Sequence, residues 1–530
     1  MVFHKKVVAA MCVLCVVMMA MPIASAKKPE VKKILFVPHD SRPISEKQTV
    51  EVVEKLGYEV EVPPDNIMGT NESLGKPDEL WQWMEANAKN AKAAVISSDT
   101  MLYGSLVGSR KHDYSKEKIL QRAKRFQSFR KENPKMQIYV FGSIMRTPRS
   151  GEASGHMEPE YYAGYGADIF RYTALKDKEE VSGLSAREKK EIGFLQKLIP
   201  EASLNDWLGR RKRNLEANKY LIDLAQKGMF DYLVLGRDDN APFSQTHMER
   251  RNLETYAKGL TSSKYRSMSG IDEVGMLLLS RAVNADRKET PFVYVRYNIG
   301  SGESTVPAYS DEKIGNSIHD AITVAGALQV RQPEQADLVL LVNTNRNGKT
   351  FEAADYKNDT KEKTVSRYFA EIISEHLEKG YPVALADIAY ANGADNALME
   401  ELRKRGALFR LRSYSGWNTP TNSTGFAIGE GLLARNMKQE DKDELLLVRY
   451  LDDWAYQANI RNSVARQLGW FRGDGVYGRL DDKKQTVSYR ALNMLKSFVK
   501  ENIDYPKNLG IEEISFPWNR MFEADIDYKF

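Results

Sequence analysis

Short apolar, β-branched segments alternate with amphipathic segments along most of this chain. The first apolar segment covers residues 34–38, and others follow at 58–62, 93–97, 137–141 and 232–235. Helix-like stretches separate them, and one of these has capping-box spacing from Ser45 to Gln48, which predicts a helix that begins there. This alternation is typical of parallel sheets whose strands are joined by helices. The sequence therefore predicts an α/β fold.

A similar order returns after residue 290. The predicted strands of this part are 292–296, 328–331, 338–342, 382–386 and 407–411, and the predicted helices include 314–325 and 396–404. We interpret the chain as mostly parallel sheets in two Rossmann-like halves with helical additions. A decorated TIM-type β/α barrel is the alternative, because about eight strands and this length would also suit a barrel.

The predicted domain organisation follows from these patterns. It comprises a signal peptide at 1–26, a first α/β half at 27–285 with a helical insertion at about 160–228, a second α/β half at 286–435, and a mainly helical region at 436–530 that packs on the rest.

The first 26 residues have the three parts of a secretory signal peptide. Lys5 and Lys6 supply the positive start, residues 7–21 form an apolar run, and Ala24-Ser25-Ala26 is a small-x-small cleavage site. The apolar run is short for a bilayer span, although an uncleaved N-terminal anchor is the alternative. We expect cleavage after Ala26, a secreted or extracytoplasmic location, and no membrane span in the mature chain.

Cysteine content and charge narrow the function classes. The only two cysteines, Cys12 and Cys15, lie in the signal segment, so the mature chain has no disulfide, thiolate metal site or cysteine nucleophile. Of 77 basic residues, two lie in the signal segment, which leaves 75 basic against 72 acidic residues. This near balance gives no reason to expect a nucleic-acid partner. The absence of disulfides in an exported chain favours a bacterial origin.

Polar residues follow nearly every predicted strand. Both candidate architectures bind ligands at the carboxyl ends of their strands, so these residues are the candidate site. Capping of the next helix is the competing explanation for single Asp, Asn and Ser residues. It does not suit Arg42 and Arg146, because the helix dipole disfavours positive charge at an N-terminus. Trp417 beside Asn418 would suit a sugar ring, although a core position for the tryptophan is equally common.

The residue assignments follow from these strand ends. The predicted catalytic carboxylates are Asp40, Asp99, Asp238 and Asp239. The predicted substrate-binding residues are His39, Arg42, Tyr103, Arg146, Asn240, Asn343, Asn345, Asp387, Trp417 and Asn418.

Two chemistries fit this set of residues. Two carboxylates can act as acid and base across a glycosidic bond. Alternatively, His39, Asp40, Asp99 and Asp239 could hold a divalent metal for hydrolysis, but no histidine pair has ligand spacing, so we expect no metal and no cofactor. The chain has no G-x-S-x-G elbow and no phosphate-binding glycine motif, so a serine hydrolase and a nucleotide-binding protein are unsupported.

Several motifs together resemble a known family. They are His39-Asp40-Ser41-Arg42-Pro43, Ser98-Asp99-Thr100 with Tyr103-Gly104, Arg237-Asp238-Asp239-Asn240, Ser415-Gly416-Trp417-Asn418-Thr419, and the stretch from Tyr450 to Gln457. In these motifs the chain resembles a bacterial family of secreted proteins catalogued as domain of unknown function 4127. The resemblance implies one integrated unit over nearly the whole mature chain, and it implies no catalytic residue.

From the residues we expect a secreted, glycoside hydrolase-like enzyme that acts on an extracellular carbohydrate or cell-wall glycan through strand-end carboxylates. A non-catalytic sugar- or solute-binding protein is one alternative, because two lobes around a cleft also describe that class. A metal-dependent hydrolase is the other. The expected partner is an extracellular glycan or a small-molecule substrate.

Overall fold

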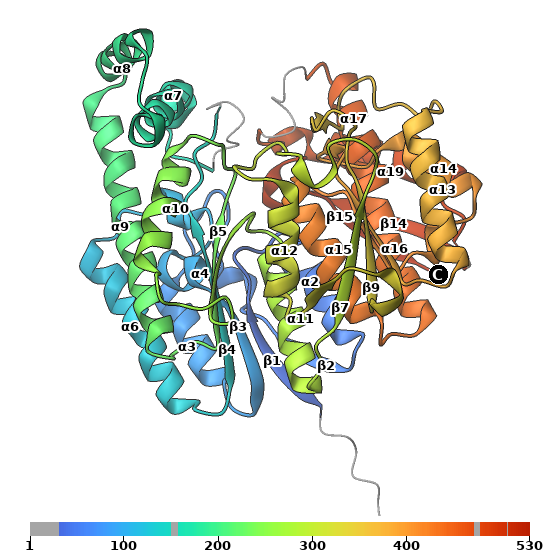
Figure 1. Ribbon diagram of the computed structural model, residues 1–530, viewed down its shortest axis with the longest axis horizontal. Helices are drawn as coiled ribbons and strands as arrows, with labels where there is room; N and C mark the ends of the chain where they lie inside the picture. The colour runs from blue at the N-terminus through green and yellow to red at the C-terminus, as the bar shows by residue number, and fades with distance from the viewer. Residues whose placement is uncertain (1–30, 150–156, 471–477, 506) are drawn as a thin grey trace, which may run out of the picture. The chain divides into compact units, whose positions relative to one another are not determined.

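The first half of the chain forms a sheet with the strand order β2-β1-β3-β4-β5-β6 (Figure 1). The computed structural model describes residues 31–149, 157–470, 478–505 and 507–530, so the predicted signal peptide lies outside the described residues. The strands are β1 Lys32–Val37, β2 Tyr58–Glu61, β3 Ala91–Ser97, β4 Gln137–Ile144, β5 Tyr232–Arg237 and β6 Tyr265–Ser269. Strands β1, β3, β4, β5 and β6 pair in parallel. The interiors of β1 and β3 are apolar and buried, as expected for a parallel sheet covered on both faces.

Helices connect these strands. They are α2 Lys47–Glu54, η1 Asp65–Ile67, α3 Pro77–Asn87, α4 Ser98–Tyr103, α5 Gly108–Lys111, α6 Lys116–Glu132, α7 Tyr161–Ser182, α8 Ala186–Leu198, α9 Glu201–Gln226, α10 Gln245–Tyr256 and α11 Val274–Arg287. Helices α7 to α9 occupy the segment predicted to be a helical insertion. The helix predicted to begin at Ser45 begins at Lys47 instead. Its capping contact is not made, because the Ser45 hydroxyl lies 3.2 Å from Nε2 of His39.

The second sheet repeats the topology of the first. Its strands are β7 Phe292–Tyr297, β8 Leu328–Val330, β9 Leu338–Asn343, β11 Val383–Asp387 and β13 Ser413–Ser415. They pair in parallel in the order β13-β11-β9-β7-β8. Taken in chain order, the first five strands of each sheet have the arrangement 2-1-3-4-5 of flavodoxin-like doubly wound folds. The prediction of two Rossmann-like halves is therefore confirmed, and the barrel alternative is wrong.

Helices also connect the strands of the second sheet. They are η3 Gly302–Ser304, α12 Ile314–Val324, η4 Pro333–Gln335, α13 Thr364–Glu378, α14 Asn396–Lys404, η5 Leu408–Arg410 and α15 Pro420–Ala434, with a short parallel pair of β10 Phe351–Glu352 and β12 Tyr390–Ala391. The strand predicted at 407–411 is wrong. The backbone N–H of Ala407 still closes α14 onto Leu402, and η5 follows before β13 begins at Ser413.

The C-terminal region contains helices and a pair of strands. The helices are α16 Gln439–Arg449, the π-helical segment η6 Tyr450–Ile460, α17 Arg461–Gln467, η7 Asp481–Lys483, α19 Lys484–Asn502 and η8 Pro517–Asn519. Strands β14 Gly510–Ser515 and β15 Asp525–Lys529 pair in antiparallel fashion, which the prediction of a mainly helical region did not include. Among the described residues, no helix combines the length and apolar character that crossing a bilayer requires.

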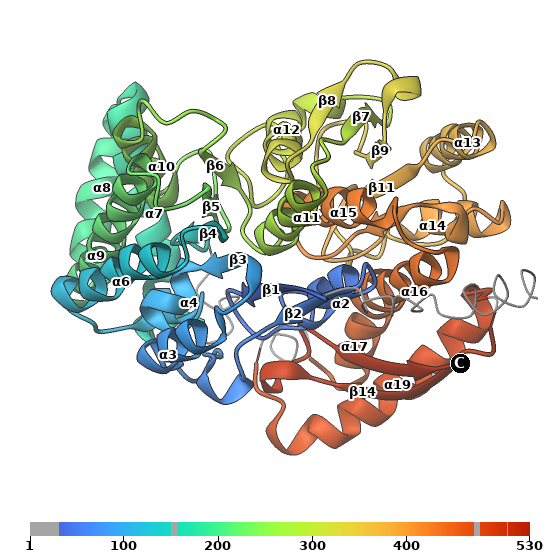
Figure 2. The ribbon, with the colours of Figure 1, turned by 90° about the horizontal axis from the view of Figure 1, so that it is seen from below.

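Helices α11 and α15 lie side by side between the two sheets (Figure 2). One continuous apolar cluster includes Phe36 of the first sheet, Leu340 of the second, and Leu278 and Phe426 of these two helices. Lys33–Phe530 accordingly form one compact unit.

Candidate active site

A cavity of about 720 Å³ lies where the carboxyl ends of the two sheets meet. Segments after β1, β4, β5 and β6 line it from the first sheet, and segments after β7, β9 and β13 line it from the second. Strands β1 and β7 are the strands at which the strand order reverses in their sheets, the place where doubly wound folds bind ligands. The C-terminal region adds Trp518, Arg520 and Phe522. Both sheets and the C-terminal region therefore contribute to one cavity.

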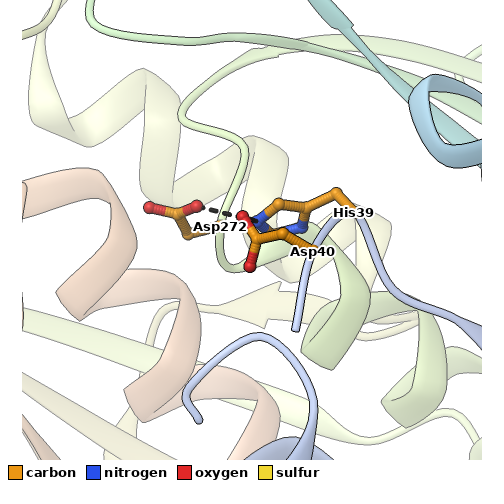
Figure 3. A group of neighbouring side chains, drawn as sticks. All are labelled: His39, Asp40 and Asp272. Carbon is orange, nitrogen blue, oxygen red and sulfur yellow. Dashed lines mark hydrogen bonds and ion pairs between the residues drawn. The ribbon is translucent and has the colours of Figure 1, made fainter. Parts of the chain in front are cut away.

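Arg42 lies at the centre of a buried charged cluster on the wall of this cavity. Its Nε donates to both oxygens of Asp40 at 3.0 and 2.9 Å, and its Nη2 donates to Asp272 at 2.5 Å. His39 shares the same Asp272 oxygen at 2.9 Å (Figure 3). Burial would raise the pKa of Asp272, but the Arg42 charge and the His39 hydrogen bond outweigh it, so the pKa is lowered. Asp272 is therefore ionised at neutral pH.

One potential metal-ligand atom from each of His39, Asp40 and Asp272 lies within 4.8 Å of the other two, a spacing that would suit a metal ion. The Arg42 guanidinium lies against all three, since its Nη2 is also 3.1 Å from Nε2 of His39. A metal ion that bound to these donors would therefore have to displace Arg42.

Asp238 and Asp239 follow β5 and lie in different environments. Asp238 forms an ion pair with Arg110. Asp239 accepts a hydrogen bond from Arg146 at 2.9 Å, and Arg146 also donates to the buried Glu158 at 2.7 Å.

Asp239 has two properties expected of a functional acid. Its side chain keeps 28 % of its surface exposed. Removal of water from around the carboxylate, together with the charge of Asp238, nevertheless raises the pKa of Asp239 to about 6. Its backbone φ of 31° lies in the left-handed region, which is strained for a residue other than glycine. An aspartate that binds a proton near neutral pH on a cavity wall is able to transfer it.

Amide and aromatic side chains complete the wall. Asn418 and Asn422 each donate to the second oxygen of Asp272 at 3.0 Å, which links the second sheet to the charged cluster. Trp518 is half-buried, and the guanidinium carbons of Arg42 and Arg520 lie 5.5 and 5.1 Å from its ring centre. Amides and an aromatic face are the groups with which proteins hold polyhydroxylated ligands.

Comparison with protein-family models identifies the family of this chain. The family model described as "Protein of unknown function (DUF4127)" matches residues 34–527. The chain belongs to the DUF4127 family. No curated protein and no solved structure matches the chain. The matched residues include every segment that lines the cavity of this DUF4127 chain.

Half of the predicted site residues of the DUF4127 chain line the cavity. These are Asp40, Arg42, Arg146, Asp238, Asp239, Asn240 and Asn418. The others lie elsewhere among the described residues: His39, Asp99, Tyr103, Asn343, Asn345, Asp387 and Trp417.

The residues away from the cavity have structural partners. Asp99 is buried and accepts the backbone N–H of Ser143 at 2.7 Å, and burial raises its pKa to about 7. Tyr103 stacks on His112. His39 lies behind the wall and contacts the site through Asp272. Trp417 is in the core, packed against Phe426, so the aromatic residue near the ligand space is Trp518 instead.

Three other predicted residues belong to the second sheet. Asp387 and Asn343 form a separate buried network in which Asp387 accepts from Asn343 at 2.9 Å and from the backbone N–H of Asp395 at 2.7 Å. Asn345 donates to the backbone carbonyls of Lys349 and Ala389. Asp395 is an example of an aspartate that caps a helix, because its side chain accepts the backbone N–H of Ala397 at the start of α14.

Five residues that line the DUF4127 cavity were not among the predicted site residues: Arg110, Asp272, Asn422, Trp518 and Arg520. Asp272 follows β6, whose residues Tyr265–Ser269 include Arg266 and two serines and so lack the apolar run that marks a strand. Arg110 lies on a four-residue helix, and Arg520 lies in the segment between two strands that were not predicted. The sequence feature that comes nearest to indicating Asp272 is its position two residues after Gly270, the glycine that follows β6.

Proposed function

We propose that this chain is a secreted hydrolase of an extracellular carbohydrate or cell-wall glycan, and that the cavity is its active site. The observation that carries the proposal is the contrast between Asp239, whose pKa is raised to about 6, and Asp272, whose pKa is lowered, on one cavity wall. Carboxyl groups whose environments separate their pKa values in this way are assigned as proton donor and ionised partner in glycosidases.

The roles of the residues follow from these environments. Asp239 is the proposed acid that protonates the leaving oxygen of the glycosidic bond. Asp272 accepts four hydrogen bonds, from His39, Arg42, Asn418 and Asn422, and its fixed negative charge would stabilise positive charge on the sugar ring. Asp238, on the same wall, is the second carboxylate available for attack on the sugar or for activating water.

The test is release of reducing ends from a glycan panel by the wild-type chain and by Asp239→Asn. Loss of the acid is expected to lower kcat by about two to four powers of ten, because a positioned proton donor contributes that much. The thermal midpoint is expected to stay the same, since the change removes charge and almost no volume. The matched control is Asp99→Asn, which lies off the cavity and is expected to keep the wild-type kcat per folded molecule.

Two outcomes would count against the proposal. Wild-type turnover by Asp239→Asn would remove Asp239 as the acid. Binding of a glycan in the cavity without product after long incubation would favour a sugar- or solute-binding protein, since two parallel sheets around a cavity also suit that class.

Export is part of the same proposal, because the N-terminal charge, apolar run and Ala24-Ser25-Ala26 are those of a signal peptide. When cells express the full-length chain, the protein recovered from the medium is expected to begin at Lys27. N-terminal sequencing and intact-mass measurement check this. Retention of the uncleaved chain in the cell fraction would contradict it.

A further inference from the structure

The cavity wall carries an unusual number of cationic side chains. Six of them line it, against four carboxylates: Arg42, Arg110, Arg146, Arg149, Lys349 and Arg520, with Asp40, Asp238, Asp239 and Asp272. Three of the cations, Arg42, Arg146 and Arg520, each donate at least two hydrogen bonds to carboxylates. Arg110 donates one, to Asp238. The remaining three determine what the cavity would accept.

Arg110 is a buried guanidinium with donors to spare. Its side chain is 3 % exposed, and Nη2 donates to Asp238. Nε and Nη1 make no hydrogen bond with any described residue, and Nη1 is 3.7 Å from the nearest Glu158 oxygen. Buried donors without acceptors are rare and cost stability, so they point to an acceptor that arrives with a ligand.

The electrostatic surroundings of Arg110 also favour an anion. Burial and the neighbouring Arg146 charge lower its pKa, and the charges of Asp238, Glu158 and Asp239 only partly offset them. Glu158 already contacts both arginines, at 2.7 Å from Nε of Arg146 and 3.7 Å from Nη1 of Arg110. A further oxyanion at the unbonded Nε and Nη1 of Arg110 would complete the hydrogen bonds of this guanidinium, since arginine binds carboxylate and phosphate groups through paired N–H donors.

Two exposed cations lie on the cavity wall from opposite sheets. Arg149 follows β4 of the first sheet, and Lys349 follows β9 of the second. Neither forms an ion pair within the part of the chain that the structure describes; Arg149 lies over the ring of Phe170, at 5.6 Å from its centre. Arginine–carboxylate pairs alone would also serve a neutral sugar. Cations without carboxylate partners add positive charge to the cavity, which attracts an anionic ligand more than a neutral one.

We infer that the cavity binds an anionic sugar, with its carboxylate or phosphate group at Arg110 and Arg146. The inference deepens the proposed function and rests on it only for the carbohydrate nature of the ligand. The shared chemistry is an oxyanion on a sugar, as in a uronic acid or a sugar phosphate.

The experiment measures binding of galacturonate, galactose 6-phosphate and neutral galactose to the full chain by isothermal calorimetry. At least one of the two anions is expected to bind more tightly than galactose, and which one binds identifies carboxylate or phosphate as the group. Arg110→Gln is expected to weaken that anion's binding about tenfold or more, since a hydrogen bond to a charged group contributes about 1.5 to 3 kcal/mol. The matched control is Arg125→Gln on the outer surface of α6, where Arg125 pairs with Glu85; it is expected to bind like the wild type.

The inference would be overturned if galactose bound as tightly as the tighter-binding anion, if neither anion bound, or if Arg110→Gln and Arg125→Gln lost the same affinity. These failures differ from failure of the proposed function. If an anion binds but no glycan is hydrolysed, the inference of an anionic ligand holds and the proposed hydrolase function is wrong. If only neutral glycans are hydrolysed and no anion binds, the proposed hydrolase function holds and the inference of an anionic ligand is wrong.

Discussion

Glu273 is a buried carboxyl group directly behind the cavity wall. It precedes α11 and follows Asp272, its side chain is fully buried, and neither oxygen makes a hydrogen bond with another described side chain. Two glycines make room for it: a Cβ at Gly270 would lie 2.0 Å from Oε1, and a Cβ at Gly425 would lie 2.3 Å from Cγ. Burial, with the charge of Asp272, raises its pKa well above the ordinary value of 4.5. Glu273 is therefore harder to ionise than an exposed glutamate.

This raised pKa predicts a pH-dependent gain in stability for Glu273→Gln. Such a carboxyl group has a higher pKa in the folded state than in the unfolded state. It does not lower the stability of the protein at a pH below its unfolded-state pKa. The loss of stability grows as the pH rises from there towards the folded-state pKa. The variant is therefore expected to have a free energy of unfolding about 1 to 3 kcal/mol above wild type at pH 7 and close to wild type at pH 4. Urea unfolding at both pH values measures this.

The control for that measurement is Glu79→Gln on the exposed surface of α3, where a change within about 0.5 kcal/mol is expected at either pH. A loss of stability in Glu273→Gln at pH 7 would mean that the glutamate is ionised and paired in the folded protein, contrary to its surroundings.

At the scale of elements, the contact between α11 and α15 depends on small residues. Helix α15 has Gly425, Gly429 and Gly431 within fifteen residues, and all fifteen are buried. At Gly425 a Cβ would meet Cγ and Cβ of Glu273 at 2.3 and 2.5 Å, and at Gly429 it would meet Met276 at 2.8 Å. The glycines therefore allow α15 to approach the first turn of α11, which positions Asn422 and Asp272 against each other across the cavity wall.

Gly425→Ala is expected to lower the free energy of unfolding by about 1 to 3 kcal/mol, because the added methyl group has no space and the neighbouring Cβ cannot move freely. The matched control is Gly164→Ala in α7, where the new Cβ meets nothing within 4 Å. Alanine there is expected to stabilise the helix by up to about 1 kcal/mol. Urea denaturation of both variants measures the difference, and equal effects would show that α11 and α15 are not in close contact.

In the whole molecule, the two sheets share one apolar core between them, and each sheet has a further apolar cluster on its other face. The largest apolar cluster contains residues from β1, β3 and β4 of one sheet and from β9 and β11 of the other, joined through α11, α12 and α15. Unfolding one half would expose the apolar faces that cover the other.

The shared core predicts one cooperative unfolding transition for Lys33–Phe530. In differential scanning calorimetry a single peak is expected, with the calorimetric enthalpy close to the van't Hoff enthalpy, as for a unit without populated intermediates. Tryptophan fluorescence and far-UV circular dichroism are expected to report the same midpoint. Two resolved peaks would show that the halves fold as independent domains.

Local patterns in the sequence were enough to predict most of the parallel strands and connecting helices, and part of the site. Apolar runs such as 338–342 and the helix at 396–404 depend on side-chain periodicity, which is a local property. Parallel strands place their carboxyl ends at one edge, so polar residues directly after β1, β4 and β5 lie on the cavity, among them Arg42, Arg146 and Asp239.

Only the tertiary structure decided which strand ends face the ligand space and which residues complete it. Asp387 is the last residue of β11 and Asp40 follows β1, so both lie at strand ends. The oxygens of Asp387, however, accept hydrogen bonds from Asn343, Tyr414 and the backbone of Asp395. Asp272 acquires its lowered pKa from Arg42, 230 positions away in the chain. Arg520 lies on the wall because the segment between β14 and β15 carries it there. Such contacts depend on how the two sheets and the C-terminal region pack together, and no local pattern of residues encodes that packing.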